Sequence, residues 1–383
     1  MRILVLGGAG AMGMVTVRDL AETSEVSEVI IGDVNLEKAE KIAEWAGKEK
    51  VSIRKVDISN IESLASAMKE VDAVANAAPY HLNLTVTTAA IQTRKNLTDL
   101  GGVYYMTLKQ LELNNEAKEA GVTVVLGCGL APGVADILAK HGADKLDRVD
   151  EVHIWYGDRS FEPAKYKWSF RTVLEEYTKG PVVYDDGEFK RLPPFSGKQL
   201  VDFPLPVGER PCCYALYSGL ATLPRTINKG VKKVDCSMSY TEEDELRIKV
   251  LNELGLTKEA PVKIDGVEIS PKEFLLKCVP PPDVKAKDAS SLIVEVKGEK
   301  NGLPTKITYS LVQKFHEEYG VSAIAYLTGV PLSIVSQMLA RGEIREKGVL
   351  PPETAVPHEQ FFQELAKRGI TINETVETTS KLA

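Results

Sequence analysis

The stretch of sequence that decides the fold is ILVLGGAGAMG, residues 3–13. Its first four residues, Ile3 to Leu6, form an apolar run that stops at glycines, which is typical of a buried parallel strand. A helical pattern follows from about Ala11 to Glu22, and a second apolar run over residues 29–31 leads to Asp33. Strand, glycine turn, helix and strand in this order indicate a βαβ unit.

Residues 8–13 within that stretch match the pattern G-x-G-x-x-G, and each glycine has a physical reason. Gly8 permits the tight turn out of the strand, Gly10 leaves room for a pyrophosphate against the backbone, and Gly13 lets the helix lie close to the sheet. Backbone N–H groups and the positive end of the helix dipole would then hold the pyrophosphate of a dinucleotide. The loop residues expected to contact this cofactor are Gly8, Ala9, Gly10, Ala11, Met12 and Gly13.

Asp33 lies twenty residues after Gly13, at the end of the second expected strand. A carboxylate at this place can accept hydrogen bonds from both ribose hydroxyls of NAD, and it would repel the 2′-phosphate of NADP. The residues that follow at once, Val34 to Leu36, include no arginine. We therefore expect NAD as the cofactor, with a glycine-rich turn in some other α/β protein as the alternative.

The alternation of strand and helix continues through the first third of the chain. Further strands are expected at residues 51–56, 71–75, 96–100 and 122–126, and helices at residues 36–46, 61–68, 84–93 and 108–120. Short connections between alternating strands and helices predict an α/β fold with a doubly wound parallel sheet, the Rossmann arrangement.

Two more strand ends are expected to line the cofactor, because ligands bind at the carboxyl ends of parallel strands. Asp57 and Ile58 follow the third strand and would lie near the adenine, although ordinary loop chemistry explains Asp57 equally well. The residues after the fourth strand are small and allow close approach to the nicotinamide ribose. They are Asn76, Ala77, Ala78 and Pro79.

The chain changes character after the first third. Expected strands at residues 152–156, 231–240, 292–296 and 306–315 are separated by long, proline-containing segments. Residues 322–341 and 359–368 are helical in pattern, and residues 370–372 resemble a strand. We expect a cofactor domain at residues 1–135, an α+β substrate domain at 136–315, and a helical segment at 316–383 that packs back on the first domain.

Composition narrows the function further. A net charge of −7 and the lack of a long basic run argue against nucleic acid as a partner. The apolar run after Arg2 is too short for a signal peptide, and no stretch approaches the ~18 apolar residues of a membrane span. The five cysteines have no CxxC spacing and the five histidines are isolated, so we expect no metal site and no disulfide framework. A cytoplasmic protein without a membrane partner is the resulting expectation.

Several further motifs occur in a fixed order along the chain. They are NAAPY at residues 76–80, DLGG at 99–102, GLAPG at 129–133, YKWSF at 166–170 with Asp186-Gly187 downstream, and GVLPPE at 348–353. With the glycine loop and Asp33, they make the chain resemble the saccharopine dehydrogenase-like family over nearly its whole length. The resemblance implies a Rossmann domain completed by C-terminal helices and an inserted α/β domain that mediates dimerisation. A homodimer or a higher homo-oligomer is therefore expected.

Within this family the chain looks most similar to the lysine 6-dehydrogenases, because Ala131 stands in the GLAPG motif where saccharopine reductases usually carry Asp. This resemblance implies NAD-dependent oxidative deamination of the ε-amine of L-lysine, giving the 6-semialdehyde, which cyclises to piperideine-6-carboxylate, and ammonia. One alternative is a saccharopine or carboxynorspermidine dehydrogenase-type reductase that joins an amine to an aldehyde. Another alternative, of a different class, is a non-catalytic protein that binds or senses NAD.

An amine must lose its proton before its carbon can give up a hydride, so a base is expected near the nicotinamide. Asp99 ends the fifth strand and could orient or deprotonate the amine, or it could simply cap a turn. Tyr80 and His81 follow the turn on the nicotinamide side and are the other catalytic candidates.

A substrate carboxylate calls for a cation, and a planar guanidinium grips a carboxylate with two parallel hydrogen bonds. Arg171 and Arg225 are the candidates for this role, with a surface arginine as the plain alternative for each. Ser169 and Thr222 are candidates for hydrogen bonds to the small-molecule amine or amino-acid substrate.

Overall fold

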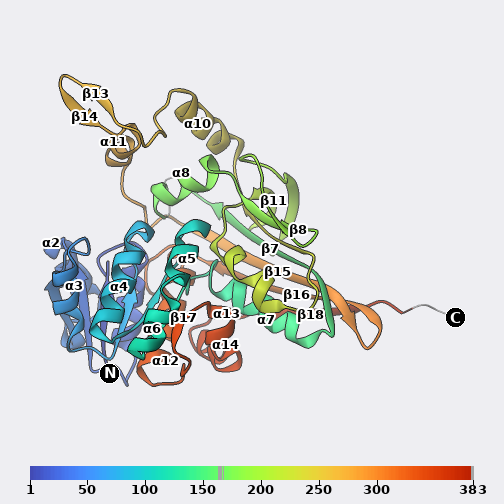
Figure 1. Ribbon diagram of the computed structural model, residues 1–383, viewed down its shortest axis with the longest axis horizontal. Helices are drawn as coiled ribbons and strands as arrows, with labels where there is room; N and C mark the ends of the chain where they lie inside the picture. Colours follow the sequence, from blue (N-terminus) through green and yellow to red (C-terminus); the bar gives the residue numbers. More distant parts are fainter. Residues whose placement is uncertain (163–165, 167, 381–383) are drawn as a thin grey trace.

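The computed structural model describes residues 1–162, 166 and 168–380, and two sheets dominate it (Figure 1). Within these residues, seven strands form the first sheet in the order β17-β6-β5-β4-β1-β2-β3, and every neighbouring pair is parallel. The strands are β1 (Arg2–Leu6), β2 (Glu28–Asp33), β3 (Val51–Lys55), β4 (Ala73–Asn76), β5 (Asn96–Asp99), β6 (Thr123–Val125) and β17 (Gly348–Leu350). The Rossmann prediction is confirmed.

Helices connect these strands and cover the sheet (Figure 1). They are α1 (Gly13–Glu22), α2 (Leu36–Ala46), η1 (Lys48–Lys50), α3 (Ile61–Met68), η2 (Tyr80–Leu82), α4 (Asn83–Thr93), α5 (Tyr104–Leu111) and α6 (Asn114–Ala120). The single helix expected at residues 108–120 is therefore two helices. The second helix begins at Asn114, whose side chain accepts a hydrogen bond of 3.0 Å from the backbone N–H of Val349 in β17.

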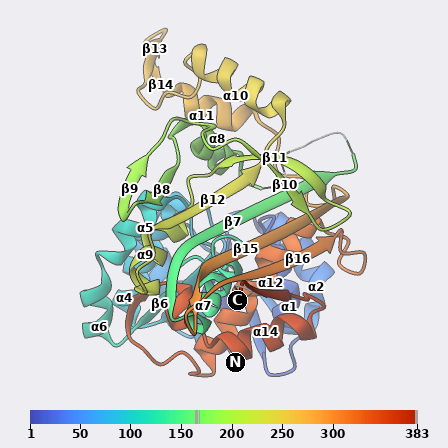
Figure 2. The ribbon, with the colours of Figure 1, turned by 90° about the vertical axis from the view of Figure 1, so that its right-hand side faces the viewer.

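The second sheet is mixed, as expected of an α+β domain. In the described part of the chain it has nine strands, seven of them in the order β10-β11-β12-β7-β15-β16-β18, with β8 paired to β12 and β9 paired to β8. They are β7 (Arg148–Ser160), β8 (Val182–Asp185), β9 (Glu188–Arg191), β10 (Gln199–Phe203), β11 (Gly208–Tyr214), β12 (Lys233–Ser239), β15 (Asp288–Lys300), β16 (Leu303–Lys314) and β18 (Asn373–Thr378). Figure 2 shows β12, β7, β15 and β16 side by side.

Four short helices flank this sheet, and a further group of elements projects beyond it. The flanking helices are α7 (Val134–Lys145), α8 (Phe170–Thr178), η3 (Ser218–Ala221) and α9 (Leu223–Ile227). The projecting group, residues 242–282, is called the arm below, and it is at the top of Figure 1 and of Figure 2. It contains α10 (Glu242–Glu253), β13 (Val262–Ile264), β14 (Val267–Ile269) and α11 (Pro271–Cys278).

The C-terminal segment serves both sheets. Its helices are α12 (Ala323–Ala340), α13 (Pro352–Ala355) and α14 (His358–Lys367), and β17 between them is the edge strand of the first sheet. No strand forms at residues 370–372, because the backbone N–H of Ile370 donates to the carbonyl of Leu365 at the end of α14. The strand begins instead at Asn373 and pairs with β16 of the second sheet. The last segment therefore returns to the first sheet and then ends on the second.

α12 is the central helix of this arrangement, and it corrects one expectation. It is apolar and long enough, at 18 residues, to cross a membrane by length and composition, although we expected no such stretch. Alanine, serine, glycine and threonine interrupt its large apolar residues, which hides the run in the sequence. In the fold 89% of the helix is buried against protein, including α1 and strands β4 and β5.

The contact between α12 and α1 is unusually close. A Cβ atom on Gly329 would lie 2.6 Å from Cβ of Val15 and 2.7 Å from the carbonyl oxygen of Met12, so only glycine fits. The hydroxyl of Thr16 donates a hydrogen bond of 2.8 Å to the carbonyl of Gly329. The helix that begins at the glycine loop is thus fixed by backbone contact to a segment more than three hundred residues later.

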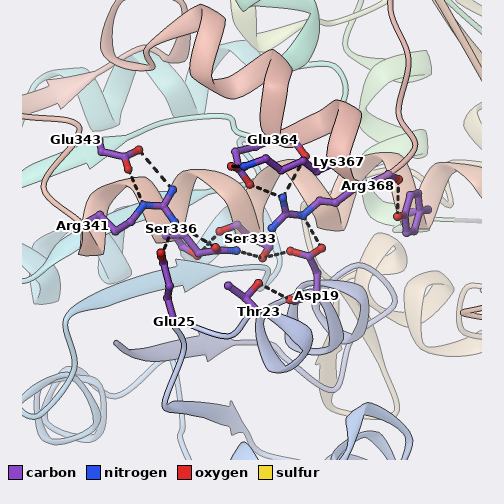
Figure 3. Close-up of polar contacts among 12 residues, drawn as sticks. Asp19, Thr23, Glu25, Ser333, Ser336, Arg341, Glu343, Glu364, Lys367 and Arg368 are labelled. Atoms are coloured by element: carbon purple, nitrogen blue, oxygen red, sulfur yellow. Dashed lines mark hydrogen bonds and ion pairs between the residues drawn. The ribbon is translucent and has the colours of Figure 1, made fainter.

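A buried ion pair fixes the far end of α1 (Figure 3). Arg368 donates from Nε to a carboxylate oxygen of Asp19 at 2.6 Å, and Ser333 of α12 donates to the other oxygen. The exposed fractions of the two charged side chains are 12% for Arg368 and 6% for Asp19. Arg368, at the end of α14, also donates to Glu364 of that helix. Residues of α1, α12 and α14 therefore meet at the carboxylate of Asp19.

We expect Arg368→Ala to lower the free energy of unfolding by about 3–5 kcal/mol, because it leaves Asp19 charged and buried without its cation. Denaturant unfolding followed by circular dichroism measures the change. Lys367→Ala is the matched control, since Lys367 makes an exposed ion pair with Glu364 and its loss should cost less than about 1 kcal/mol. Equal effects of the two substitutions would contradict the assigned role of Arg368.

Candidate functional site

A cleft of about 790 Å³ lies at the carboxyl ends of the first sheet's central strands. Its walls come from the glycine loop, from the segments that follow β2, β4, β5 and β6, from the start of α8 and from α11 of the arm. The cleft therefore lies between the Rossmann sheet, the second domain and the arm. This is the place where ligands bind in open parallel sheets.

The glycine loop forms one end of the cleft. Gly7 has a φ of 68°, and its carbonyl accepts a hydrogen bond of 2.8 Å from the backbone of Gly10. A Cβ atom on Gly13 would lie 2.3 Å from that same carbonyl, so the turn requires glycine there. In the first turn of α1, the N–H groups of Met14, Val15 and Thr16 donate to the carbonyls of Gly10 and Met12, so the backbone that faces the cleft is that of the loop at residues 10–12. A dinucleotide pyrophosphate fits this loop by chemistry and by space.

The loop residues divide between the surface of the cleft and the layer beneath it. Gly10, Ala11 and Met12 line the cleft. Gly8, Ala9 and Gly13 lie behind them and shape the turn. Gly8, for example, is closely packed, since a Cβ atom would lie 3.1 Å from the side chain of Ile31 and 3.1 Å from the carbonyl oxygen of Val5.

Asp33 is on the wall of the cleft, beside the loop. One carboxylate oxygen accepts a hydrogen bond of 3.2 Å from the backbone of Ala9, and the other accepts one of 3.0 Å from Asn35. These contacts fix the carboxylate at the end of β2, where the ribose of a bound dinucleotide would pass. Each oxygen keeps a further lone pair for a ribose hydroxyl.

The other cofactor candidates are placed in two ways. Ala77, Ala78 and Pro79 line the cleft, and their contact with a cofactor stays a prediction. Asn76 is buried beneath them, where its amide donates to Asn83 at 3.0 Å and its carbonyl oxygen accepts from Ala78 at 3.1 Å. Its role in the structure is therefore to brace the turn.

Asp57 and Ile58 do not line the cleft, which corrects the expectation for the third strand end. The carboxylate of Asp57 accepts from the backbone and hydroxyl of Ser59, at 3.0 and 2.6 Å, and forms a local turn before α3. These hydrogen bonds lower the pKa of Asp57. Ile58 is buried in the core.

Asp99 is also not on the cleft surface, which corrects its place among the catalytic candidates. It is fully buried, and it accepts hydrogen bonds from the backbones of Gly101 at 2.7 Å and Gly127 at 2.8 Å, and from the side chain of Gln110 at 2.8 Å. Burial raises the pKa of Asp99 against these hydrogen bonds. The turn-cap alternative describes Asp99, which holds two glycine turns together under the cleft.

Tyr80 and His81 both line the cleft, directly after the turn that follows β4. Their rings meet edge to face, with 6.0 Å between centroids. Burial raises the pKa of Tyr80, so its phenol stays protonated and can donate a hydrogen bond. Burial also lowers the pKa of His81, so its imidazole is neutral at physiological pH.

Of the four substrate candidates, Ser169 and Arg171 line the cleft, and Thr222 and Arg225 do not. Thr222 is buried at the start of α9, where its hydroxyl donates to the carbonyl of Gly219 at 3.3 Å. Arg225 is exposed and lies over the ring of Phe189, 5.7 Å from its centroid. Both belong to the packing of α9 on α7 and η3, so the structure corrects the expectation that they meet the substrate.

Arg171 extends from the first turn of α8 and is already engaged. Its two terminal nitrogens donate to the two carboxylate oxygens of Glu273 on α11, at 2.8 and 2.7 Å. This is the fork geometry in which a guanidinium would bind a substrate carboxylate. The pair joins the second domain to the arm across the cleft.

Glu176 is the cleft residue that our sequence reasoning missed. It lies on α8 and lines the cleft, yet its Oε2 atom is shielded from solvent and has no hydrogen-bond partner among the described residues. Burial raises the pKa of Glu176 to about 8. Helical periodicity could have found it, because Glu176 lies at the edge of the apolar face formed by Phe170, Val173 and Tyr177.

The cleft therefore combines a loop shaped for a dinucleotide with groups suited to an amine and an acid. Glu176 offers a carboxyl group without a cation, and Arg171 offers a guanidinium paired with one half-exposed carboxylate, that of Glu273. Among the described residues there is no group of three or more His, Cys, Asp or Glu side chains able to hold a metal ion.

Comparisons with known proteins match both parts of the chain. The model of the saccharopine dehydrogenase NADP binding domain matches residues 3–125, and that of the saccharopine dehydrogenase C-terminal domain matches residues 129–370. Carboxyaminopropylagmatine dehydrogenase from Synechocystis is 24% identical, with 97% of each chain covered. Carboxynorspermidine synthase from Vibrio cholerae is 27% identical, with 95% of this chain and 94% of the relative covered.

Solved structures show the same fold at low identity. Saccharopine dehydrogenase from Saccharomyces cerevisiae superposes with a TM-score of 0.75 at 19% identity, covering 98% of this chain and 99% of the other. Homospermidine synthase from Legionella pneumophila, in complex with NAD, superposes with a TM-score of 0.70 at 12% identity, covering 98% and 91%.

The half-buried Glu176, whose Oε2 atom is shielded from solvent, predicts a pH dependence of stability. Its pKa is about 8 in the fold against an ordinary 4.5, so the folded chain holds a proton that the unfolded chain releases between these values. Stability from this group is full below pH 4.5 and is lost as the pH rises through about 8. Glu176→Gln cannot ionise, so we expect it to unfold at a higher temperature than the wild type at about pH 8.5 and with little difference at about pH 5.

Thermal unfolding at these pH values measures the effect. Glu268→Gln, an exposed residue of β14, is the control and should follow the wild type throughout. A Glu176→Gln variant whose unfolding temperature is below the wild type at alkaline pH would contradict the proposed state of this carboxyl.

Proposed function

The chain belongs to the saccharopine dehydrogenase family, and we propose that it is an NAD(P)-dependent oxidoreductase that forms or cleaves the C–N bond of a carboxylated secondary amine. The observation that carries this proposal is the unpartnered carboxylate of Glu176 in the same cleft as Arg171. Relatives named for carboxynorspermidine, carboxyaminopropylagmatine and saccharopine support it.

Glu176 supplies a place for the substrate nitrogen. A carboxylate shielded from water is unfavourable until it meets a cation or a donor, so it favours an ammonium group over a neutral or anionic one. With a pKa of about 8, the same group can also exchange a proton with the nitrogen near neutral pH. The amine-binding and the proton-transfer roles therefore fall on one side chain.

Arg171 supplies a place for the substrate carboxylate. It extends from the same helix as Glu176, and α8 thus presents to one cleft a guanidinium and a carboxyl group that a bound ammonium would keep ionised. A molecule that carries both an amine and a carboxylate matches this arrangement, whereas a simple polyamine has no group that could take the place of Glu273 on the arginine. Tyr80 adds a donor and His81 a neutral imidazole on the nicotinamide side.

In the reductive direction, an amine and an aldehyde condense with loss of water to an imine. A reduced nicotinamide bound at the glycine loop supplies the hydride to the imine carbon. Protonated Glu176 then gives the proton that the nitrogen requires, and the product is a secondary amine. In the oxidative direction the same carboxylate takes that proton back.

Asp33 leads us to propose NAD over NADP for this chain. Its carboxylate is fixed by Ala9 and Asn35 in a position that a 2′-phosphate would approach. The carboxylate of Asp33 and a 2′-phosphate are both negatively charged, so their repulsion would disfavour NADP.

The lysine ε-amine stays the competing substrate, because Ala131, the residue that suggested it, also lines the cleft. A substrate panel separates the readings. We expect oxidation of the reduced cofactor when a short diamine is given together with an aldehyde that carries a carboxylate, and none when either compound is omitted. Reduced cofactor formed from L-lysine and NAD, with release of ammonia, would instead establish the deaminase.

The same panel tests the non-catalytic alternative. Binding of NAD or NADH without turnover of any amine, amine-aldehyde pair or saccharopine would show a binding protein. Glu176→Gln serves as the internal control of the panel, since it should bind the cofactor as the wild type does and lose most of the turnover.

Asp33→Ala tests the cofactor preference. We expect it to weaken NAD affinity by about tenfold or more, because the ribose hydroxyls lose a charged acceptor. The ratio of the NADP dissociation constant to the NAD dissociation constant should fall as a result. Dissociation constants for both cofactors, measured by fluorescence or calorimetry, give the ratio. Asp57→Ala, at the next strand end but away from the cleft, is the control. An unchanged ratio in Asp33→Ala would refute the role of this carboxylate.

A further inference from the structure

The ion pair between Arg171 and Glu273 occupies the contact that a substrate carboxylate would need. Both terminal nitrogens of Arg171 donate to Glu273, and both residues line the cleft. The exposed fractions of the side chains are 21% for Arg171 and 53% for Glu273, so the carboxylate is the more accessible partner. An incoming carboxylate meets an arginine that is already satisfied by the protein.

The arm does not depend on this pair for its attachment to the second domain. Lys272, the residue before Glu273, is buried and forms ion pairs with Glu175 of α8 and with Glu259 of the arm. Lys179 at the end of α8 pairs with Glu175 and Glu259 as well, at 2.7 and 3.4 Å. Release of Glu273 from Arg171 would therefore leave α11 in place.

A second partner for Glu273 is present on the same helix. Lys277 lies one turn further along α11 and lines the cleft, and in the described part of the chain it forms no ion pair. Glutamate followed by lysine four residues later is the favourable order for a pair on a helix surface. Glu273 can thus leave Arg171 and remain paired.

From these contacts we propose that Glu273 is an internal stand-in for the substrate carboxylate and determines specificity. Without substrate it holds Arg171, and when a carboxylated substrate binds, it passes to Lys277 while the substrate takes the guanidinium. The exchange keeps every charge paired only when the substrate brings a carboxylate. An amine without one cannot displace Glu273. The proposal rests on the proposed function, because it assumes a carboxylated substrate.

Binding of glutarate, a dicarboxylate without an amine, tests this exchange independently of turnover. Calorimetry of the full chain should give about three- to tenfold tighter binding for Glu273→Gln than for the wild type, because the internal competitor is lost. Arg171→Met combined with Glu273→Gln should lose the gain. Lys277→Met should bind glutarate more weakly than the wild type, because Glu273 then has no second partner.

Glu259→Gln is the matched control, since it removes an acidic group of the same arm that pairs with Lys272 and not with Arg171, and it should bind as the wild type does. Equal or weaker binding in Glu273→Gln, or no glutarate binding in either protein, would overturn the proposal. Tighter glutarate binding in Glu273→Gln, with no turnover of carboxylated amines, would contradict the proposed function and still support the exchange of Glu273. Turnover of carboxylated amines, with the same glutarate affinity in Glu273→Gln and the wild type, would support the proposed function and contradict the exchange of Glu273.

Discussion

The close contact between α12 and α1 at Gly329 is the constraint on which the rest of the structure depends. It brings a late segment of the chain against the helix whose first turn faces the glycine loop, and the buried pair of Asp19 and Arg368 fixes the other end of that helix. The direction of α1, and with it the position offered to a pyrophosphate, is therefore set by residues at the opposite end of the sequence. β18 then pairs with β16, so the C-terminal segment contributes a strand to both sheets.

Function in this cleft follows from the placement of a few opposite charges. α8 presents Arg171, which is paired with the carboxylate of Glu273, and Glu176, whose Oε2 atom has no partner among the described residues. Groups of this kind favour a ligand with its own cation and anion over a ligand with only one of them. In the function that we propose, the glycine loop and Asp33 hold the cofactor, and residues of the second domain and the arm select the amine.

Local patterns were sufficient to predict the Rossmann half. The run from Ile3 to Asp33 and the alternation after it depend on contacts between neighbours in the sequence, so composition and spacing reveal them. β17 escaped prediction because three residues carry no period, and its partner strand lies more than two hundred residues earlier. Asp99 shows a different limit: a strand end predicts a position near the ligand, but only the structure shows a carboxylate turned inward to three donors. Glu176 shows a further limit. The sequence places an acid beside an apolar helix face, but only the structure shows whether that acid has a hydrogen-bond partner.

The central claim is that this cleft reduces an imine formed from an amine and a carboxylated aldehyde. Deuteride transfer tests it most directly: the reduced cofactor is deuterated on the nicotinamide ring carbon that gives up the hydride, and the product is analysed by mass spectrometry and NMR. We predict a secondary amine that carries a carboxylate and has deuterium on the carbon bonded to nitrogen. A product without deuterium would contradict the account. So would reduction of NAD with lysine as the only substrate that reacts, accompanied by release of ammonia.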